Sequence, residues 1–372
     1  MTYARGEASA PAAATIFQGR PLNRAAPFSA VFVAILALSG AAGGVFAQTK
    51  STVPSAAAPS VTSAQRLMVR QKYAEAVRET EAVLRNDPGN IDALYTLAAI
   101  EQTRILDYES YAVDGARFIS LADSLSETLD RRQAALRGGD SLRCLFYRAN
   151  LLGGISLMHA KRGAWMEGAK TAMAASGMYK QVKKIDPGHL GAELGLGIFD
   201  YYFGTSLKWI PFASGGSVER GLESVERALR APFPFDHAAK SSYCWMLIDR
   251  KQYKKADSLA HTVLREIPTG TIFLRIRALI ALWAGCYDDA LFLGGKLRDL
   301  SEKRAPVNWS DLSASYYIIT SAYDNLGKKA EALKAADKGL ALPMPPEFRN
   351  MPNIKEHAKF LAGIKNKYNK KK

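Results

Sequence analysis

The sequence contains few of the residue patterns that carry enzyme chemistry. Its five histidines are scattered, and no two of them have the i, i+4 spacing that places two metal ligands on one face of a helix. No serine occupies a Gly-x-Ser-x-Gly elbow. Residues 163–171 resemble a phosphate-binding loop, but an additional alanine breaks the Gly-Lys-Thr spacing and no strand precedes it. The sequence therefore predicts a protein that is not an enzyme and that has neither a metal site nor a small-molecule cofactor.

Cysteine is also scarce, with three residues in the chain. Cys144 and Cys244 lie on apolar helical faces, where a small hydrophobic residue is favoured, and Cys286 lies at a predicted turn. An odd number of cysteines cannot form a complete set of disulfides within one chain. Free thiols are the first interpretation, and a bridge between Cys244 and Cys286 is the alternative.

The N-terminal apolar run is short for a membrane span. Residues 28–38 are largely apolar, follow Arg20 and Arg24, and precede a small-x-small sequence that ends at Ala47. These are the three parts of a secretory signal peptide, whereas a membrane span needs about 20 apolar residues. We predict a signal peptide over residues 1–47 and an exported protein, periplasmic or associated with the outer envelope of a bacterial-type cell. An uncleaved inner-membrane anchor is the alternative.

A helical pattern returns at a fixed interval in the second half of the chain. Tyr253 and Ala256 recur as Tyr287 and Ala290, 34 residues later. Small side chains at such points let helix axes approach closely, and an aromatic ring at the start of a second helix fills the space inside a hairpin. This period, with these residues, resembles the tetratricopeptide repeat. The resemblance implies a stack of helical hairpins that acts as a binding scaffold.

The repeat pattern predicts an all-α fold. We expect an α-solenoid of about seven antiparallel helical hairpins, closed by a C-terminal capping helix. Residues 48–62 are rich in Ser, Ala, Pro and Thr, a composition that buries too little apolar surface to fold, and they are predicted to form a flexible linker. The solenoid would occupy residues 63–372, with regular repeats near 63–90, 237–270, 271–304 and 313–346, irregular units over 91–234, and the cap over 353–372.

A second and shorter resemblance lies in the fourth predicted hairpin. Its motif runs from Leu196 to Tyr202, continues at Trp209, and ends at Leu222. The motif is similar to a segment of the eukaryotic tetratricopeptide family numbered thirty-nine, which includes yeast inclusion-body clearance proteins. Because those proteins lack a cleaved signal of the bacterial type, the resemblance implies architecture and no cellular role.

The first helices of the hairpins are expected to line a concave groove, which is the predicted binding surface. Aromatic and arginine side chains are favoured at binding hot spots. The candidate partner-binding residues are Tyr201, Tyr202, Trp245, Asp249, Arg275, Trp283, Tyr317 and Asn325. The alternative is that Trp245 and Trp283 fill the interior of the superhelix. The Lys and Asn arrangement with which some family members clamp a peptide carboxylate is not found at the matching positions.

An insertion over residues 204–217 carries two exposed-looking aromatic residues, Trp209 and Phe212. A loop packed on its own repeat is the first interpretation, and the alternative is a surface loop that forms a lid over the groove or touches a membrane.

The formal net charge of the chain is +15, and part of this charge lies in the tail over residues 365–372. Such a tail is usually a solvated end, and the alternative is attraction to an anionic envelope surface. No nucleic-acid partner is predicted, because the remaining Lys and Arg are spread over every repeat. The predicted function is a non-catalytic exported scaffold that binds a protein or peptide partner in its groove. A lipid- or anionic-surface-binding module is the alternative.

Overall fold

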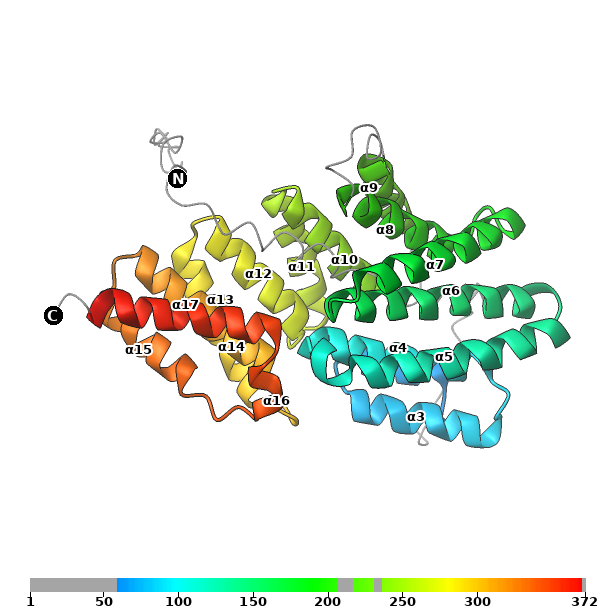
Figure 1. The fold of residues 1–372 in the computed structure, drawn as a ribbon, viewed down its shortest axis with the longest axis horizontal. Helices are drawn as coiled ribbons and strands as arrows, with labels where there is room; N and C mark the ends of the chain where they lie inside the picture. The colour runs from blue at the N-terminus through cyan, green and yellow to red at the C-terminus, as the bar shows by residue number, and fades with distance from the viewer. Residues whose placement is uncertain (1–58, 207–216, 231–235, 370–372) are drawn as a thin grey trace, which may run out of the picture.

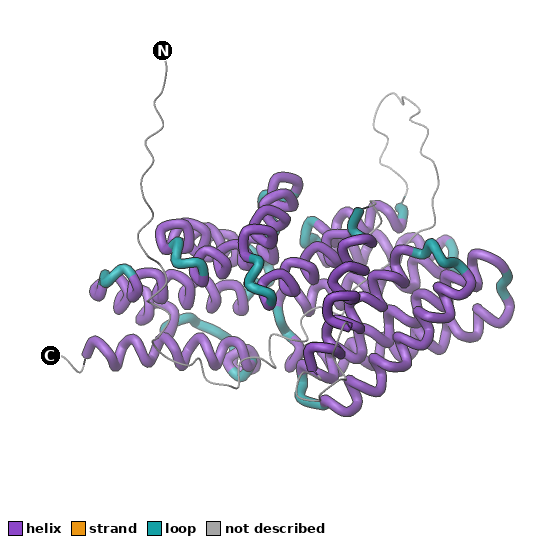
Figure 2. The backbone as a smooth tube through the Cα atoms, turned by 90° about the horizontal axis from the view of Figure 1, so that it is seen from above, coloured by secondary structure: helices purple, strands orange, loops and turns teal. Residues whose placement is uncertain are grey.

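The computed structural model describes residues 59–206, 217–230 and 236–369, and these ranges form helices and no strand (Figure 1). The helices are α2 (Val61–Val69), α3 (Tyr73–Asn86), α4 (Ile91–Tyr108), α5 (Tyr111–Ala135), α6 (Gly138–Lys161), α7 (Trp165–Ile185), α8 (Leu190–Ser206), α9 (Ser217–Ala228), α10 (Asp236–Asp249), α11 (Tyr253–Glu266), α12 (Thr271–Trp283), α13 (Tyr287–Glu302), α14 (Trp309–Asn325), α15 (Lys329–Leu340), α16 (Pro346–Arg349) and α17 (Pro352–Asn369). Consecutive helices from α2 to α15 pack as hairpins, and Figure 2 shows the hairpins stacked side by side. The all-α solenoid prediction is confirmed, and α2 begins two residues inside the segment predicted as linker.

The turns of the hairpins explain why each helix ends where it does. In six hairpins the turn holds a residue with a positive φ angle, the left-handed conformation that stops a helix. These residues are Gln71, Glu109, Gly163, Lys251, Gly285 and Gly327. Between the first two hairpins, the N–H of Gly89 donates to the Asp87 carboxylate at 3.0 Å, and the side chain of Asn90 caps α4 by accepting from the N–H of Ala93 at 2.9 Å. Local polar residues therefore start the next helix as soon as the previous one ends.

Small residues lie at the helix crossings, as the repeat pattern predicted. Cys244, Ala256 and Ala290 are fully buried, and the Cys244 thiol lies 3.6 Å from the carbonyl oxygen of Ala256. Helices α8 and α9 cross with their backbones in close contact. There, a Cβ atom placed on Gly221 would lie 2.6 Å from the carbonyl oxygen of Gly197. The two backbones touch, so glycine is required at this crossing.

The stack folds back so that its two halves meet. The end of α4 lies beside the start of α14 (Figure 1). The hydroxyl of Tyr108 donates to the carbonyl oxygen of Pro306 at 3.0 Å. The side-chain amide of Asn308 donates to the main-chain carbonyl oxygen of Asp107 at 3.1 Å, and these two residues lie 201 positions apart in the sequence. This contact between the second hairpin and the segment that begins the last one was not predicted from the sequence.

Helix α17 covers the C-terminal end of the stack. It packs against both α14 and α15, and its Leu361 is buried between them. The ring of Tyr317 on α14 stacks on His357 of α17 with 5.1 Å between ring centroids, and meets the ring of Phe360 edge-on at 4.9 Å. The predicted capping helix is therefore present. It shields the apolar face of the terminal repeat from water, which the end of such a stack requires.

A further prediction concerns the N-terminal segment and membrane crossing. The predicted signal peptide lies outside the described residues. Within the described ranges, no helix combines the length and the apolar character that crossing a membrane requires.

All three cysteines are unpaired, with Cys144 and Cys244 buried and Cys286 exposed. The alternative of a bridge between Cys244 and Cys286 is therefore wrong.

Candidate functional site

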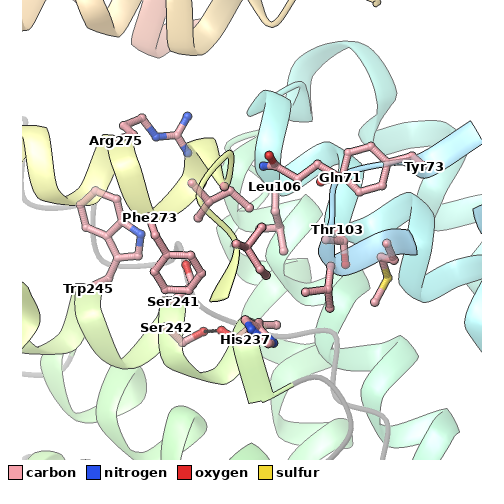
Figure 3. Close-up of a pocket in the computed structure, with 16 residues that line it drawn as sticks. Gln71, Tyr73, Thr103, Leu106, His237, Ser241, Ser242, Trp245, Phe273 and Arg275 are labelled. Atoms are coloured by element: carbon pink, nitrogen blue, oxygen red, sulfur yellow. Dashed lines mark hydrogen bonds between the residues drawn. The ribbon is translucent and has the colours of Figure 1, made fainter. Parts of the chain in front are cut away.

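A cavity of about 80 Å³ lies on the inner side of the stack, between the first repeats and the repeats around α10 to α12 (Figure 3). Its lining residues are Met68, Val69, Gln71, Tyr73, Thr103, Leu106, His237, Ala238, Ser241, Ser242, Trp245, Ile267, Gly270, Ile272, Phe273 and Arg275. Most of the lining is apolar, with hydroxyl groups at a few points. A water molecule occupies about 30 Å³ in the liquid, so the cavity has room for a few waters or for one branched aliphatic group.

A buried hydrogen-bonded network joins the two sides of this cavity, and it is centred on the fully buried Asp107. The carboxylate of Asp107 accepts from the hydroxyl of Tyr73 at 2.8 Å and pairs with the guanidinium of Arg304 at 2.7 Å. It also accepts from the hydroxyl of Thr271, the first residue of α12, at 3.3 Å. These partners come from α3, α12 and the segment before α14. The network therefore holds the N-terminal repeats against the C-terminal ones.

Arg275 is the second centre of the network. Its side chain is buried, and its guanidinium pairs with Asp311 at 2.6 Å and with Glu109 at 3.5 Å. Glu109 also accepts from the hydroxyl of Ser310 at 2.7 Å. Burial acts to raise the pKa of Glu109, but the Arg275 charge and the Ser310 hydrogen bond outweigh it and hold that pKa below its usual value. The guanidinium that was predicted to bind a partner is thus largely occupied by carboxylates of the same chain.

Two basic groups on the far side of Glu109 have depressed pKa values. Burial lowers the pKa of His357 to about 4, and burial lowers the pKa of Lys161 to about 8. Glu109 opposes both shifts, and Arg275 adds to both. His357 is consequently neutral at pH 7, where its Nδ1 lies 3.1 Å from the hydroxyl of Ser313.

The buried His357 predicts a loss of stability in acid. The unfolded chain binds a proton at this histidine below about pH 6.5, whereas the folded chain does so only below about 4. The stability associated with neutral His357 is therefore complete above pH 6.5 and is lost as the pH falls toward 4. Between pH 7 and pH 4.5 we expect His357→Gln to lose less free energy of unfolding than the wild type, by on the order of 2 kcal/mol. Urea denaturation at both pH values measures this difference, and parallel losses in the two proteins would contradict the assignment.

The structure brings two of the predicted groove residues together and gives others a packing role. Trp245 and Arg275 both line the cavity. Tyr201 and Tyr202 are buried, and the hydroxyl of Tyr201 donates to the carboxylate of Asp249 at 2.7 Å. Tyr201 therefore joins α8 to α10, and the buried Tyr201 and Tyr202 are corrected from partner contacts to packing residues, whereas Asp249 is exposed. Gly197 of α8 lies against Gly221 of α9, so α9 packs directly on this side of α8.

The remaining predicted site residues lie apart from the cavity. Trp283 is 39% exposed at the end of α12, and the exposed Asn325 donates to the carbonyl oxygen of Ser321 in its own helix. Tyr317 is covered by α17 and is corrected to a residue of the capping interface. Trp209 and Phe212 lie outside the described residues, so their predicted role as a surface or lid loop stays a prediction.

Sequence reasoning missed the N-terminal half of the site. Met68, Thr103 and Leu106 line the cavity from α2 and α4, opposite Phe273 of α12. No periodic signal links α4 to α12, because the repeat pattern describes contacts between neighbouring hairpins only. A polar residue at the end of an apolar helix, as Asp107 is, was the available hint.

Among the described residues, no group of three or more His, Cys, Asp or Glu side chains could hold a metal ion.

Comparison with known proteins agrees with this architecture. The chain is similar to a chain of the APC/C hetero-tetramer Cut9-Hcn1, with a TM-score of 0.53 and 15% sequence identity, over 80% of this chain and 48% of that one. This chain thus matches about half the length of the Cut9-Hcn1 chain. The fold is a tetratricopeptide-repeat-like α-solenoid. A tetratricopeptide repeat protein from Parabacteroides merdae also matches, with a TM-score of 0.37 and 14% identity, over 81% of this chain and 97% of that one. No protein-family model and no curated protein matches the chain.

Proposed function

We propose that this chain is a non-catalytic scaffold that binds a protein or peptide partner on the inner face of its solenoid, as an exported protein of the cell envelope. The observation that carries the binding proposal is the cavity of about 80 Å³, because it joins repeats far apart in sequence and is lined by Trp245. Export is supported by the charged, apolar and small-x-small segments within residues 1–47. The resemblance of the fourth hairpin to family thirty-nine contributes no cellular role.

The cavity fits one anchoring side chain of a partner. Phe273 and Leu106 form apolar walls, and Trp245 is half-buried beside them, so a further apolar group would complete its burial. Burying a four-carbon side chain contributes about 3 kcal/mol. A tryptophan beside a desolvated pocket is a common centre of binding energy. The remaining contacts of the partner would lie along the inner face of the stack.

Pull-down from envelope extracts tests the binding proposal. We expect Trp245→Ala to lower the recovery of a specific partner by roughly tenfold or more. The matched control is Trp283→Ala, because Trp283 is a predicted groove residue that lies away from the cavity and is 39% exposed. Arg275 is unsuitable for this purpose, since its removal would leave Glu109 and Asp311 unpaired. Equal recovery with wild type and Trp245→Ala would refute the assignment of the cavity.

Export and surface attraction are tested separately. Amino-terminal sequencing of the envelope fraction should find a chain that begins at Gln48, and an intact N-terminus would favour the uncleaved anchor. In the tail, Lys365 pairs with Asp337 at 2.8 Å and Lys367 pairs with Asp324 at 2.7 Å, so part of its charge is already balanced. We therefore expect little flotation with anionic vesicles. Strong flotation that is lost on deleting residues 365–372 would support the rival surface-binding function.

A further inference from the structure

The first turn of α12 borders the cavity and contains main-chain donors. Gly270, Ile272 and Phe273 line the cavity, and Gly270 is the N-cap residue, which has no side chain to accept from the helix start. The N–H of Thr271 donates to the amide oxygen of Gln71 at 3.2 Å. No side chain or carbonyl of the described residues accepts from the N–H groups of Ile272 and Phe273. A helix start leaves such groups without intrahelical partners, and they need an acceptor when they are buried.

Arg275, one turn further along α12, is buried beside the cavity. Its residue is 5% exposed, and its Nε–H has no hydrogen-bond partner among the described residues, although the two terminal nitrogens pair with Asp311 and Glu109. Figure 3 shows the Arg275 side chain beside Phe273 and Trp245 at the edge of the cavity. The guanidinium of Arg275 is therefore committed to its own chain, and the cavity has apolar walls with the main-chain N–H groups of Ile272 and Phe273, unpaired among the described residues, at one end.

The charge around these donors decides what kind of acceptor they can take. Asp107 is fully buried, and its carboxylate accepts from the Thr271 hydroxyl at the start of α12. This carboxylate already provides the negative charge that a helix N-terminus favours. On the network as a whole, three carboxylates, from Asp107, Glu109 and Asp311, are balanced by Arg275, Arg304 and Lys161. There is no excess positive charge to attract an anion, and a second carboxylate beside Asp107 would be repelled.

We infer that the cavity recognises an internal peptide segment in which an aliphatic residue has uncharged neighbours. The aliphatic side chain fills the cavity, and the neutral carbonyl oxygens of the same segment accept from the N–H groups at the start of α12. Acidic neighbours and a free C-terminal carboxylate are disfavoured, because their negative charges would approach Asp107. This inference rests on the proposed function and specifies the chemistry of the partner for the same site.

Three end-blocked tripeptides test the inference with the full chain. Acetyl-Ala-Leu-Ala-amide carries the aliphatic group, acetyl-Ala-Ser-Ala-amide lacks it, and acetyl-Asp-Leu-Asp-amide adds carboxylates. Binding at pH 7 is followed by NMR through the indole N–H resonance of Trp245, which Trp245→Phe identifies. We expect the Leu peptide to shift this resonance at millimolar concentration, the Ser peptide to leave it unchanged, and the Asp-flanked peptide to bind at least about tenfold more weakly.

A pair of variants locates the binding. Ser241 lines the cavity, so Ser241→Leu should fill it and abolish the response to the Leu peptide. Ser258 is exposed on α11 outside the cavity, so Ser258→Leu is the matched control and should bind as the wild type does. The peptide comparison on the wild type stands even where Ser241→Leu does not fold.

The outcomes separate this inference from the proposed function. Equal or tighter binding of the Asp-flanked peptide would overturn the preference for neutral neighbours and leave the proposed function standing. Equal binding of the Ser and Leu peptides, or no response to any of the three, would overturn the inference, whereas the proposed function is decided separately by the recovery of a partner with Trp245→Ala. Unchanged binding to a folded Ser241→Leu would place the peptide elsewhere and overturn the inference alone.

Discussion

Replacing Asp107 with alanine is expected to lower the free energy of unfolding by about 3–5 kcal/mol, the cost of removing one partner from a buried ion pair. Asp107 is fully buried, and its loss would leave the guanidinium of Arg304 and the hydroxyls of Tyr73 and Thr271 without their acceptor. Guanidinium denaturation followed by far-UV circular dichroism measures the change.

Asp123→Ala is the matched control for this prediction. Asp123 is exposed, and a surface substitution of this kind usually changes stability by less than about 0.5 kcal/mol. The loss of unfolding free energy in Asp107→Asn should lie between those of Asp107→Ala and Asp123→Ala. An amide oxygen can still accept a hydrogen bond, but it carries no charge to pair with Arg304. If Asp107→Ala proved as stable as Asp123→Ala, the network would not be holding the first and last repeats together.

The second large effect is expected at the crossing of α8 and α9. A Cβ atom on Gly221 would lie 2.5 Å from the backbone nitrogen of Tyr201 and 2.6 Å from the carbonyl oxygen of Gly197, so the helices must move apart. Overpacking of this kind costs about 1–3 kcal/mol, and contact with backbone places Gly221→Ala at the upper end of that range. Thermal or guanidinium denaturation measures the loss.

Gly177→Ala provides the opposite control on α7. Gly177 also lies within a helix, but nothing lies within 4 Å of the position of its Cβ atom. Alanine there should raise the free energy of unfolding by up to about 1 kcal/mol, because alanine has the higher helix propensity. A loss of stability at Gly177, or none at Gly221, would mean that helix propensity and not close approach decides these positions.

The hairpins could be predicted because their causes are local. Ala256 and Ala290 recur at one interval, and each lies buried at a helix crossing as expected. Lys251 has a positive φ angle, Gln252 is the N-cap residue, and Tyr253 begins α11. Such signals depend on residues within one hairpin or the next, so periodicity in the sequence is sufficient to find them.

The binding-site residues were harder to predict because helical phase alone does not say which neighbour a side chain meets. Tyr201 and Trp245 both lie on the predicted inner side of first helices. The structure buries Tyr201 against α10, where it meets Asp249, and leaves Trp245 at the cavity. The difference arises from the path of the whole stack, which decides where the N-terminal hairpins return.

By itself, the sequence determined that this chain forms helical hairpins with small residues at their crossings, since side-chain size acts between adjacent helices. Only the tertiary structure decided that α4 meets α12 and α14, that Arg275 is occupied by carboxylates of its own chain, and that a cavity remains between the two halves. The physical reason is that the contacts of α4 with the C-terminal half join residues 164 to 201 positions apart, as between Thr271 or Asn308 and Asp107, and form only when the curvature of every intervening repeat has accumulated.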